Sequence, residues 1–465
     1  MGEITVITHI KRWTATAAVA VVLGATACHL DSLTGGELST DPNNPVNATN
    51  TQLFVGTQSA VWALWGSDMS RSAGLLTQQL AGLARQYAAL ANNYAINTNV
   101  TNGFQRALYV SGGLVDIKKL EAGSLAARDT IFLGIARVLE GAFMGTGADL
   151  FGNLVYKEAI SGNPTPPLDD QMFVYDSVQN ILAAAIENLS VSPNSNNIGP
   201  GAADLVYGGD AEKWLALAHT LRARFYLNTA ETRPEAYAQA LAEAKVGIQS
   251  EAGTYFGAFT QATGENNFWY QFDIILRAGD MGPGVFLDNL LKSRNDPRRD
   301  EYFAHDAADR PIDLSTERLA PDFPQPYVSY DENTLIWAEA AYRTGDQVTA
   351  LAKLNEERAN HGLAPESVAG QALLNEILIE KYIADFQLGE QVWRDYTRTC
   401  TPNLVPSPAA AGSATGGFIP GRLNYDVSEL NTNPNYPDDS NTFWNPDDPP
   451  NATSDGTGAA CLGRQ

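Results

Sequence analysis

The sequence contains few of the residues that catalytic and metal sites use. Among 465 residues there are only three cysteines and five histidines. The histidines are His9, His29, His219, His305 and His361. They are too scattered to predict a metal cluster, and the G-x-S-x-G, H-E-x-x-H and P-loop motifs are missing from the sequence. We therefore expect no metal site and no enzyme, although the 53 acidic residues leave a carboxylate pair for glycoside hydrolysis open.

Positive charge and long apolar runs are also scarce. Lysine and arginine number 30 against 53 acidic residues, which gives a formal net charge of −23. Because phosphate binding depends on lysine and arginine, this balance argues against nucleic acid or an anionic membrane surface as the partner. No segment reaches the ~20 apolar residues that a spanning helix needs, so we expect no transmembrane span in the mature chain.

The N-terminal residues have the layout of an export signal. Lys11 and Arg12 precede an uncharged run over 14–27, which predicts a signal peptide at 1–27. Ala25-Thr26-Ala27-Cys28 resembles a bacterial lipobox, although Ala stands where Leu is usual. We therefore expect lipidation of Cys28 and a lipid tether at 28–50. Plain secretion and a chance cysteine are the alternatives.

The other two cysteines, Cys400 and Cys461, follow the export signal. An oxidising compartment permits a disulfide, so we expect these two to pair. Their bond would pin a Pro-, Asn- and Asp-rich tail at 431–465 that has no hydrophobic periodicity. The repeated Asp residues of this tail could bind calcium, but they lack the D-x-D-x-D-G order, and we interpret the tail as a solvated loop.

Apolar residues recur at three- and four-residue spacing along most of the chain, which predicts an all-α fold. The segment 214–221 is similar to the first helix of a tetratricopeptide repeat, and 235–248 supplies a second helix. Similar pairs are expected within 129–189 and 335–362. The helical spacing of apolar residues is lost at about 250–330. This segment is rich in aromatics, Gly, Asn and Pro, and we interpret it as the largest loop insertion.

Several motifs in order resemble the SusD/RagB family of outer-membrane nutrient-binding lipoproteins. They are the lipobox cysteine, NDPR at 295–298, ILIEKYIADFQLGEQVWRDYTRTCTPNL at 377–404 and IPGRLNYDVSEL at 419–430. The resemblance implies a SusD-like α-helical body over 51–430, with tetratricopeptide-like helix pairs forming a right-handed helical scaffold and long inserted loops making the ligand site. It also implies a TonB-dependent (SusC-like) outer-membrane transporter as partner.

Two stretches offer the residues that a sugar site needs. Sugars present apolar CH faces and hydroxyl rims, so they are bound by flat aromatic rings with amide side chains at the edges. The first stretch, 85–105, contributes Tyr87, Asn93 and Tyr94 as candidates; the second, 264–273, contributes Asn267, Trp269 and Tyr270. For any single aromatic residue a place in the core is the competing interpretation.

These features together predict a function in nutrient capture at the cell surface. We expect a lipid-anchored outer-membrane protein that binds oligosaccharide and delivers it to a TonB-dependent transporter, without cofactor. One alternative is the same architecture binding peptides. The other is a helical-repeat scaffold whose only partner is protein.

Overall fold

The computed structural model describes residues 48–97, 101, 103–194, 196–405, 415 and 417–438. The predicted signal peptide, Cys28, most of the predicted tether, Cys461 and the end of the predicted tail lie outside the described residues. Internal contacts divide the chain into residues 1–49 and Asn50–Gln465. The second unit holds the elements below.

Helices dominate this unit, and the few strands are short. In chain order the elements are α3 (Asn50–Gly66), α4 (Asp68–Leu76), β1 (Leu80–Gly82), α5 (Arg85–Asn93), α6 (Phe104–Ala107), α7 (Leu114–Ala127), α8 (Thr130–Phe151), α9 (Gln171–Leu189), η2 (Gly201–Ala203), α10 (Ala211–Thr229), α11 (Ala236–Ala244), η3 (Glu251–Gly253), β2 (Tyr255–Phe256), α12 (Phe268–Tyr270), η4 (Gln271–Leu276), β3 (Met281–Pro283), α13 (Val285–Arg294), α14 (Arg298–Tyr302), β4 (Phe303–His305), β5 (Pro311–Leu314), β6 (Pro326–Val328), α15 (Tyr330–Arg343), α16 (Gln347–Asn360), α17 (Gln371–Ala384), α18 (Gly389–Thr399) and α19 (Val427–Thr432).

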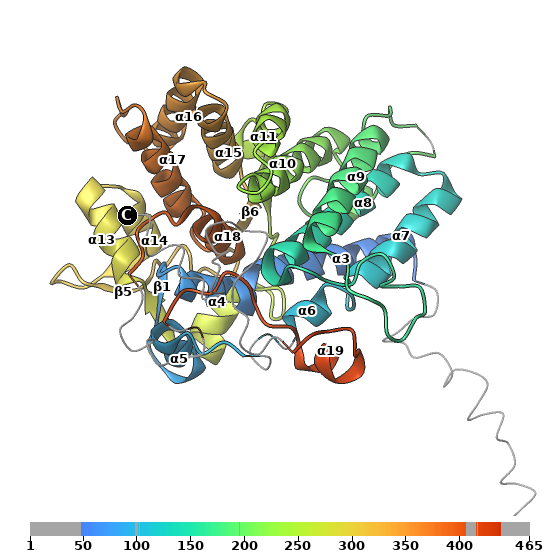
Figure 1. The fold of residues 1–465 in the computed structure, drawn as a ribbon, viewed down its shortest axis with the longest axis horizontal. Helices are drawn as coiled ribbons and strands as arrows, with labels where there is room; N and C mark the ends of the chain where they lie inside the picture. Colours follow the sequence, from blue (N-terminus) through green and yellow to red (C-terminus); the bar gives the residue numbers. More distant parts are fainter. Residues whose placement is uncertain are drawn as a thin grey trace, which may run out of the picture. The chain divides into compact units, whose positions relative to one another are not determined.

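Three helix pairs stand where the sequence predicts them. Helices α8 and α9, α10 and α11, and α15 and α16 each pack against one another, and Figure 1 shows the pairs side by side. The turn between α15 and α16 needs Gly345, whose φ of 93° favours glycine. Asp346 follows it and accepts a hydrogen bond from the Thr349 amide at 3.0 Å, so this turn ends one helix and caps the next.

Helix α8 forms the centre of the main core. It is the one helix among the described residues that is long and apolar enough to span a membrane, and 94% of that apolar window is buried inside the protein. Its glycines let neighbouring helices approach: a Cβ at Gly145 would lie 2.1 Å from the Phe225 ring, and one at Gly141 would lie 2.6 Å from Leu182. Close helix packing therefore accounts for the glycines at 141–147.

Buried ion pairs join different helices of the body. The Arg224 guanidinium of α10 donates to both carboxylate oxygens of Glu332 on α15 at 2.6 Å. Lys381 of α17 lies 2.8 Å from the Asp395 carboxylate of α18. A charge that is buried away from water needs a partner of opposite charge. These pairs therefore determine which helices pack together.

The segment 250–330 folds as short elements instead of helix pairs. It contributes to three antiparallel two-stranded sheets, β1–β3, β2–β6 and β4–β5. In the first sheet Leu80 pairs with Pro283 and Gly82 with Met281. The insertion is therefore tied back to the N-terminal helices, and this pairing positions the site described next.

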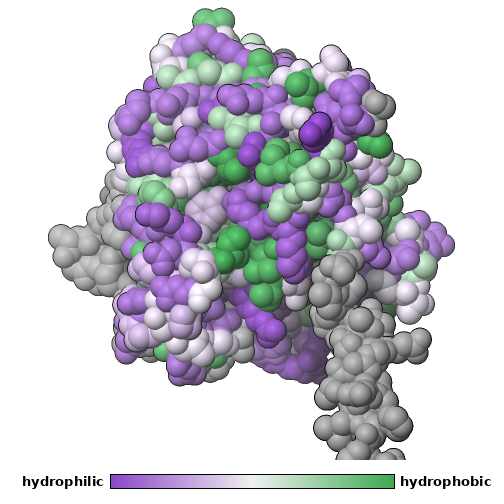
Figure 2. All heavy atoms as spheres, turned by 90° about the vertical axis from the view of Figure 1, so that its right-hand side faces the viewer, coloured by the Kyte–Doolittle hydropathy of each residue, from purple (hydrophilic) through white to green (hydrophobic). Residues whose placement is uncertain are grey.

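The molecular face shown in Figure 2 carries hydrophobic residues in small groups between hydrophilic ones. This mixture is usual for a protein surface exposed to water. A broader apolar area is found on η4, as described below.

Candidate functional site

The two stretches proposed to bind ligand meet in the folded chain. Strand β1, just before the first stretch, pairs with β3, just after the second. The rings of Tyr87 and Phe272 lie edge to face with their centroids 5.1 Å apart. Segments separated by about 180 residues in sequence are therefore packed against each other, which no residue pattern in the sequence indicates.

Most of the candidate side chains lie deeper than a stacking platform requires. Exposed fractions are 0% for Asn267, 2% for Trp269, 6% for Tyr87 and 2% for Tyr94. These rings present little face to solvent, which corrects the expectation that Trp269 stands outside the core. Asn93 is exposed and Tyr270 is partly exposed.

Local hydrogen bonding explains why Trp269 turns inward. The Asn267 side chain accepts a hydrogen bond from the Trp269 amide at 2.7 Å and so caps α12. Its amide nitrogen donates to the Phe323 carbonyl at 3.0 Å. The cap fixes the direction of the short helix, and the Arg71 guanidinium then lies 6.0 Å from the Trp269 ring centroid and 4.3 Å from that of Phe272.

A cleft of about 250 Å³ opens beside these buried rings. We call it the β1–α5 cleft; its lining residues are Leu75, Gln78, Leu80, Ala81, Gly82, Ala91, Asn92, Tyr94, Gly284, Val285, Phe286 and Val405. Phe286 supplies aromatic surface, Tyr94 lines the cleft from a buried position, and Gln78 and Asn92 supply amides. The cleft therefore has the mixture of flat apolar groups and amide groups that a sugar site needs. Its volume gives room for about one sugar ring.

Exposed apolar residues stand near the cleft. Ile274, Ile275 and Leu276 are consecutive on η4 and between 49% and 68% exposed. Helix η4 is a π-helix, a rare form that is frequent at functional sites. Leu83 and Val285 are also more than half exposed. Apolar groups gathered in this way usually mark a place where a ligand or partner binds.

Charged side chains near the cleft form a partly buried ion pair and a pair of interacting carboxyl groups. Arg85 donates to both oxygens of Asp280 at 2.5 and 2.7 Å. Burial and, next, the neighbouring Asp313 carboxylate together raise the pKa of the Asp273 carboxyl to about 7. At neutral pH, Asp273 is therefore divided between a hydrogen-bond donor form and a charged acceptor form, either of which suits a polar ligand.

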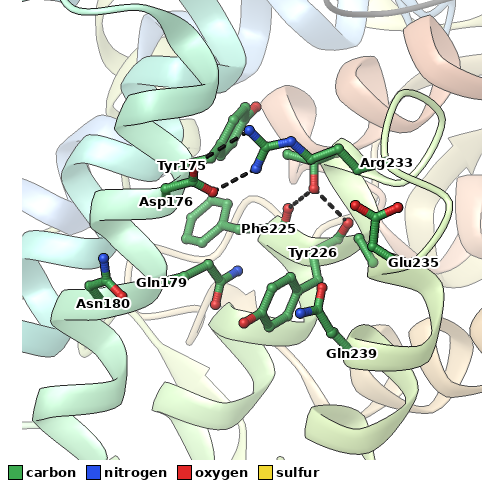
Figure 3. Close-up of a pocket in the computed structure, with 11 residues that line it drawn as sticks. Tyr175, Asp176, Gln179, Asn180, Phe225, Tyr226, Arg233, Glu235 and Gln239 are labelled. Carbon is green, nitrogen blue, oxygen red and sulfur yellow. Dashed lines mark hydrogen bonds and ion pairs between the residues drawn. The ribbon is translucent and has the colours of Figure 1, made fainter.

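A second pocket of about 360 Å³ lies between α9, α10 and α11. Figure 3 shows its polar lining, in which Arg233 donates to Asp176 at 2.6 Å. Gln179 and Gln239 add amides, and Tyr226 adds an aromatic ring. No residue pattern in the sequence marks these side chains as a site; the signal that could have found them is that a groove between tetratricopeptide-like pairs is a natural binding place.

The predicted pair of cysteines can be followed only in part. Cys400 ends α18 and is disulfide-bonded. Cys28 and Cys461 both lie outside the described residues, so pairing of Cys400 with Cys461 stays a prediction. Lipidation of Cys28 stays a prediction for the same reason.

Comparison with known proteins identifies the family. The SusD-like family model, described as "Starch-binding associating with outer membrane", matches residues 42–426. The chain therefore belongs to the SusD-like family, and the predicted family and tetratricopeptide-like helical fold are confirmed. Members of this family are binding proteins and not enzymes, and they associate with the outer membrane.

Solved structures share this fold at low sequence identity. A chitin-binding protein superposes with a TM-score of 0.69 at 20% identity, covering 83% of this chain and 95% of its own. A chitin-binding SusD homologue from Flavobacterium johnsoniae gives 0.67 at 18%, covering 90% and 96%. A SusD/RagB family protein from Bacteroides thetaiotaomicron gives 0.65 at 19%, covering 84% and 95%. A search of curated proteins finds no significant match.

Proposed function

We propose that this protein is a cell-surface lipoprotein that captures an oligosaccharide and delivers it to a TonB-dependent outer-membrane transporter. Its family membership supports carbohydrate binding at the outer membrane. Two structures with the same fold are named as chitin-binding, which makes a β-linked amino sugar a reasonable first ligand to test. The observation that carries the proposal is the β1–α5 cleft, which Asn92 and Tyr94 of the first predicted stretch line together with Phe286 of α13.

Two kinds of contact with the ligand are proposed: ring stacking on aromatic side chains and hydrogen bonds from amide side chains. Phe286, which lines the cleft, and the partly exposed Tyr270 of the second predicted stretch are the aromatic groups proposed to contact sugar rings. Asn92 and Asn93 are exposed at the end of α5 and can donate to or accept from hydroxyl groups. The buried candidates Trp269, Tyr87, Tyr94 and Asn267 are then proposed to support the site by holding its walls in place.

A glycan titration tests this proposal. The full chain is titrated calorimetrically against starch and chitin oligosaccharides, beside an Asn92→Ala variant and an Asn180→Ala control from the second pocket. Loss of one amide contact in the cleft should weaken binding by about 1 kcal/mol, roughly fivefold. The control should bind like wild type. If Asn180→Ala weakens glycan binding and Asn92→Ala leaves it unchanged, the second pocket is the binding site.

Peptide is the second candidate ligand, and the pocket in Figure 3 favours it. The Asp176–Arg233 pair offers one charge of each sign, and the flanking glutamines can pair with a peptide backbone. An oligopeptide mixture in the same titration, with Arg233→Ala as the variant, separates this candidate from the glycan proposal. Peptide binding lost in Arg233→Ala, together with no glycan binding, would favour it.

The anchor and the partner are parts of the same proposal. Lipidation at Cys28 should hold the chain on the outer membrane through salt and carbonate washes, and Cys28→Ala should release it. A transporter that receives the ligand should remain bound through detergent extraction, because stable complexes bury a large area. A pull-down from native membranes that recovers no transporter would contradict the delivery step.

A further inference from the structure

Three possible metal ligands gather where the α15–α16 pair opens to solvent. Asp331 lies in the first turn of α15. Glu357 and His361 come from the end of α16, four residues apart, and therefore lie on one helix face. The two helices pack against one another, so the beginning of the first meets the end of the second.

The spacing of these groups suits one small ion. His361 Nε2 lies 3.0 Å from Glu357 Oε1 and 3.5 Å from Asp331 Oδ2. One ligand atom from each residue lies within 4.8 Å of the other two. Two ligands held about 2.0 Å from a tetrahedral zinc ion are roughly 3.3 Å apart, so the measured separations bracket this value.

The buried atoms of the cluster also lack hydrogen bonds. The Glu357 side chain is 0% exposed, and neither of its oxygens has a hydrogen-bond partner among the described residues. The same is true of Asp331 Oδ1 and His361 Nε2. The 3.0 Å contact between His361 and Glu357 is therefore as short as a hydrogen bond but does not have the angle of one. Buried polar atoms are rarely left in this state unless an unseen water or ion satisfies them.

Negative charge exceeds positive charge around the cluster. The nearest cation to Glu357 among the described residues, besides His361, is Arg298, whose Nη1 lies 3.7 Å from Glu357 Oε1 while its Nη2 is bound to Asp296 at 2.6 Å. Glu251 adds a third carboxyl that interacts with Asp331. Three carboxyl groups thus share one imidazole and part of one guanidinium, an arrangement that attracts a cation.

We propose that Asp331, Glu357 and His361 bind a divalent transition metal ion, with zinc as the best match to the donors. Calcium and magnesium prefer oxygen ligands alone, whereas a mixed set with imidazole nitrogen suits zinc. The Asp331 and His361 side chains are about one-fifth exposed, so the ion can enter and keep a water or Glu251 as a fourth ligand. The ion fastens the beginning of α15 to the end of α16.

This site differs from the sequence expectation for a reason visible in the fold. The histidines are indeed scattered, but a site needs only one of them when carboxylates complete the set. Asp331 stands 30 residues before His361 in sequence, and only the helix pairing brings them together. The β1–α5 cleft is formed by other elements, so the metal proposal is independent of the proposed function.

Zinc titration of the full chain, first stripped with a chelator, tests the proposal. We expect one zinc ion per chain and a higher melting temperature in its presence. His361→Gln should weaken binding roughly 100-fold and remove the melting shift, and Glu357→Gln should weaken it at least about 10-fold. His219→Gln is the matched control, because His219 also contacts a glutamate, Glu243, at 2.5 Å but belongs to no three-ligand group among the described residues.

Location of the ion is checked on the wild-type protein, so that a variant that fails to fold cannot obscure the result. Crystals soaked in zinc should give an anomalous peak between Asp331, Glu357 and His361. A peak elsewhere, no peak, or zinc binding unchanged in a folded His361→Gln variant would overturn the proposal. Preference for calcium over zinc would overturn the assignment of the ion.

Discussion

Single buried charges connect distant parts of this chain. Arg398 donates to the two carboxylate oxygens of Glu339 at 2.7 and 2.6 Å, and both side chains are 0% exposed. Arg398 also donates to Asp395 at 2.6 Å. Removing one member of such a set leaves a buried charge without its partner, which is strongly destabilising. At the scale of residues, the motif at 377–404 therefore stabilises the fold as well as marking the family.

Trp269 and Tyr270 are neighbours with different surroundings, and they form a matched pair for mutation. Because Trp269 is 2% exposed, Trp269→Ala should cost about 3–5 kcal/mol of unfolding free energy. Tyr270 is partly exposed, so Tyr270→Ala should change stability much less while weakening ligand binding. Melting curves and glycan titration of both variants measure the two effects. A Trp269→Ala protein that melts like wild type would contradict its place in the core.

Glu390 gives the protein a pH-dependent stability. Burial, together with the nearby Asp149 carboxylate, raises the pKa of its carboxyl to about 8. The folded protein keeps a proton that the unfolded chain releases above its ordinary pKa near 4.5. The contribution of Glu390 to stability is therefore fully present below pH 4.5 and is lost as the pH rises toward 8, by up to about 1.4 kcal/mol per pH unit.

Glu390→Gln removes this titration while keeping the shape of the side chain. The variant should lose less stability than wild type between pH 5 and pH 8, as measured by denaturant unfolding at several pH values. Glu212→Gln, at an exposed position of α10, serves as the control and should retain the wild-type slope. Equal slopes for wild type and Glu390→Gln would show that another group is responsible.

At the scale of elements, the N-terminal cap of α8 is a sensitive point. Asp129 Oδ1 accepts a hydrogen bond from the Phe132 amide at 3.0 Å, and Oδ2 accepts one from the Gly199 amide at 3.0 Å. Asp129→Ala leaves both buried amides unpaired and should cost about 1–2 kcal/mol or slightly more. Asp129→Asn keeps one acceptor oxygen and should lose less. Denaturant midpoints rank the three proteins, and equal midpoints for Ala and wild type would refute the capping role.

The tetratricopeptide-like pairs and the insertion play different parts in the molecule. Helix pairs bury apolar faces against one another and create a rigid support, as Figure 1 shows for α8 to α11. The insertion uses short strands and a π-helix, which leave apolar side chains and backbone groups at the surface. Binding surfaces are commonly built from such irregular segments on a rigid frame.

At the scale of the whole molecule, the disulfide bond of Cys400, at the end of α18, is the covalent cross-link to consider. If its partner is Cys461, the bond closes a loop of about 60 residues and stabilises the fold by roughly 4 kcal/mol on the chain-entropy model. Reduction should then lower the melting temperature, and Cys461→Ser should reproduce the effect. Mass mapping of non-reduced peptides should show the 400–461 link; a link from Cys400 to another cysteine would contradict the pairing.

The family, the helical class and the main helix pairs could be predicted from the sequence, because they depend on local properties. Apolar spacing specifies a helix face, and the Gly345-Asp346 turn specifies where one helix ends and the next begins. Tertiary structure alone decided that Trp269 is buried, that β1 pairs with β3, and that His361 meets two carboxylates. These outcomes depend on which distant segments become neighbours, and a single sequence does not encode that proximity in any periodic pattern.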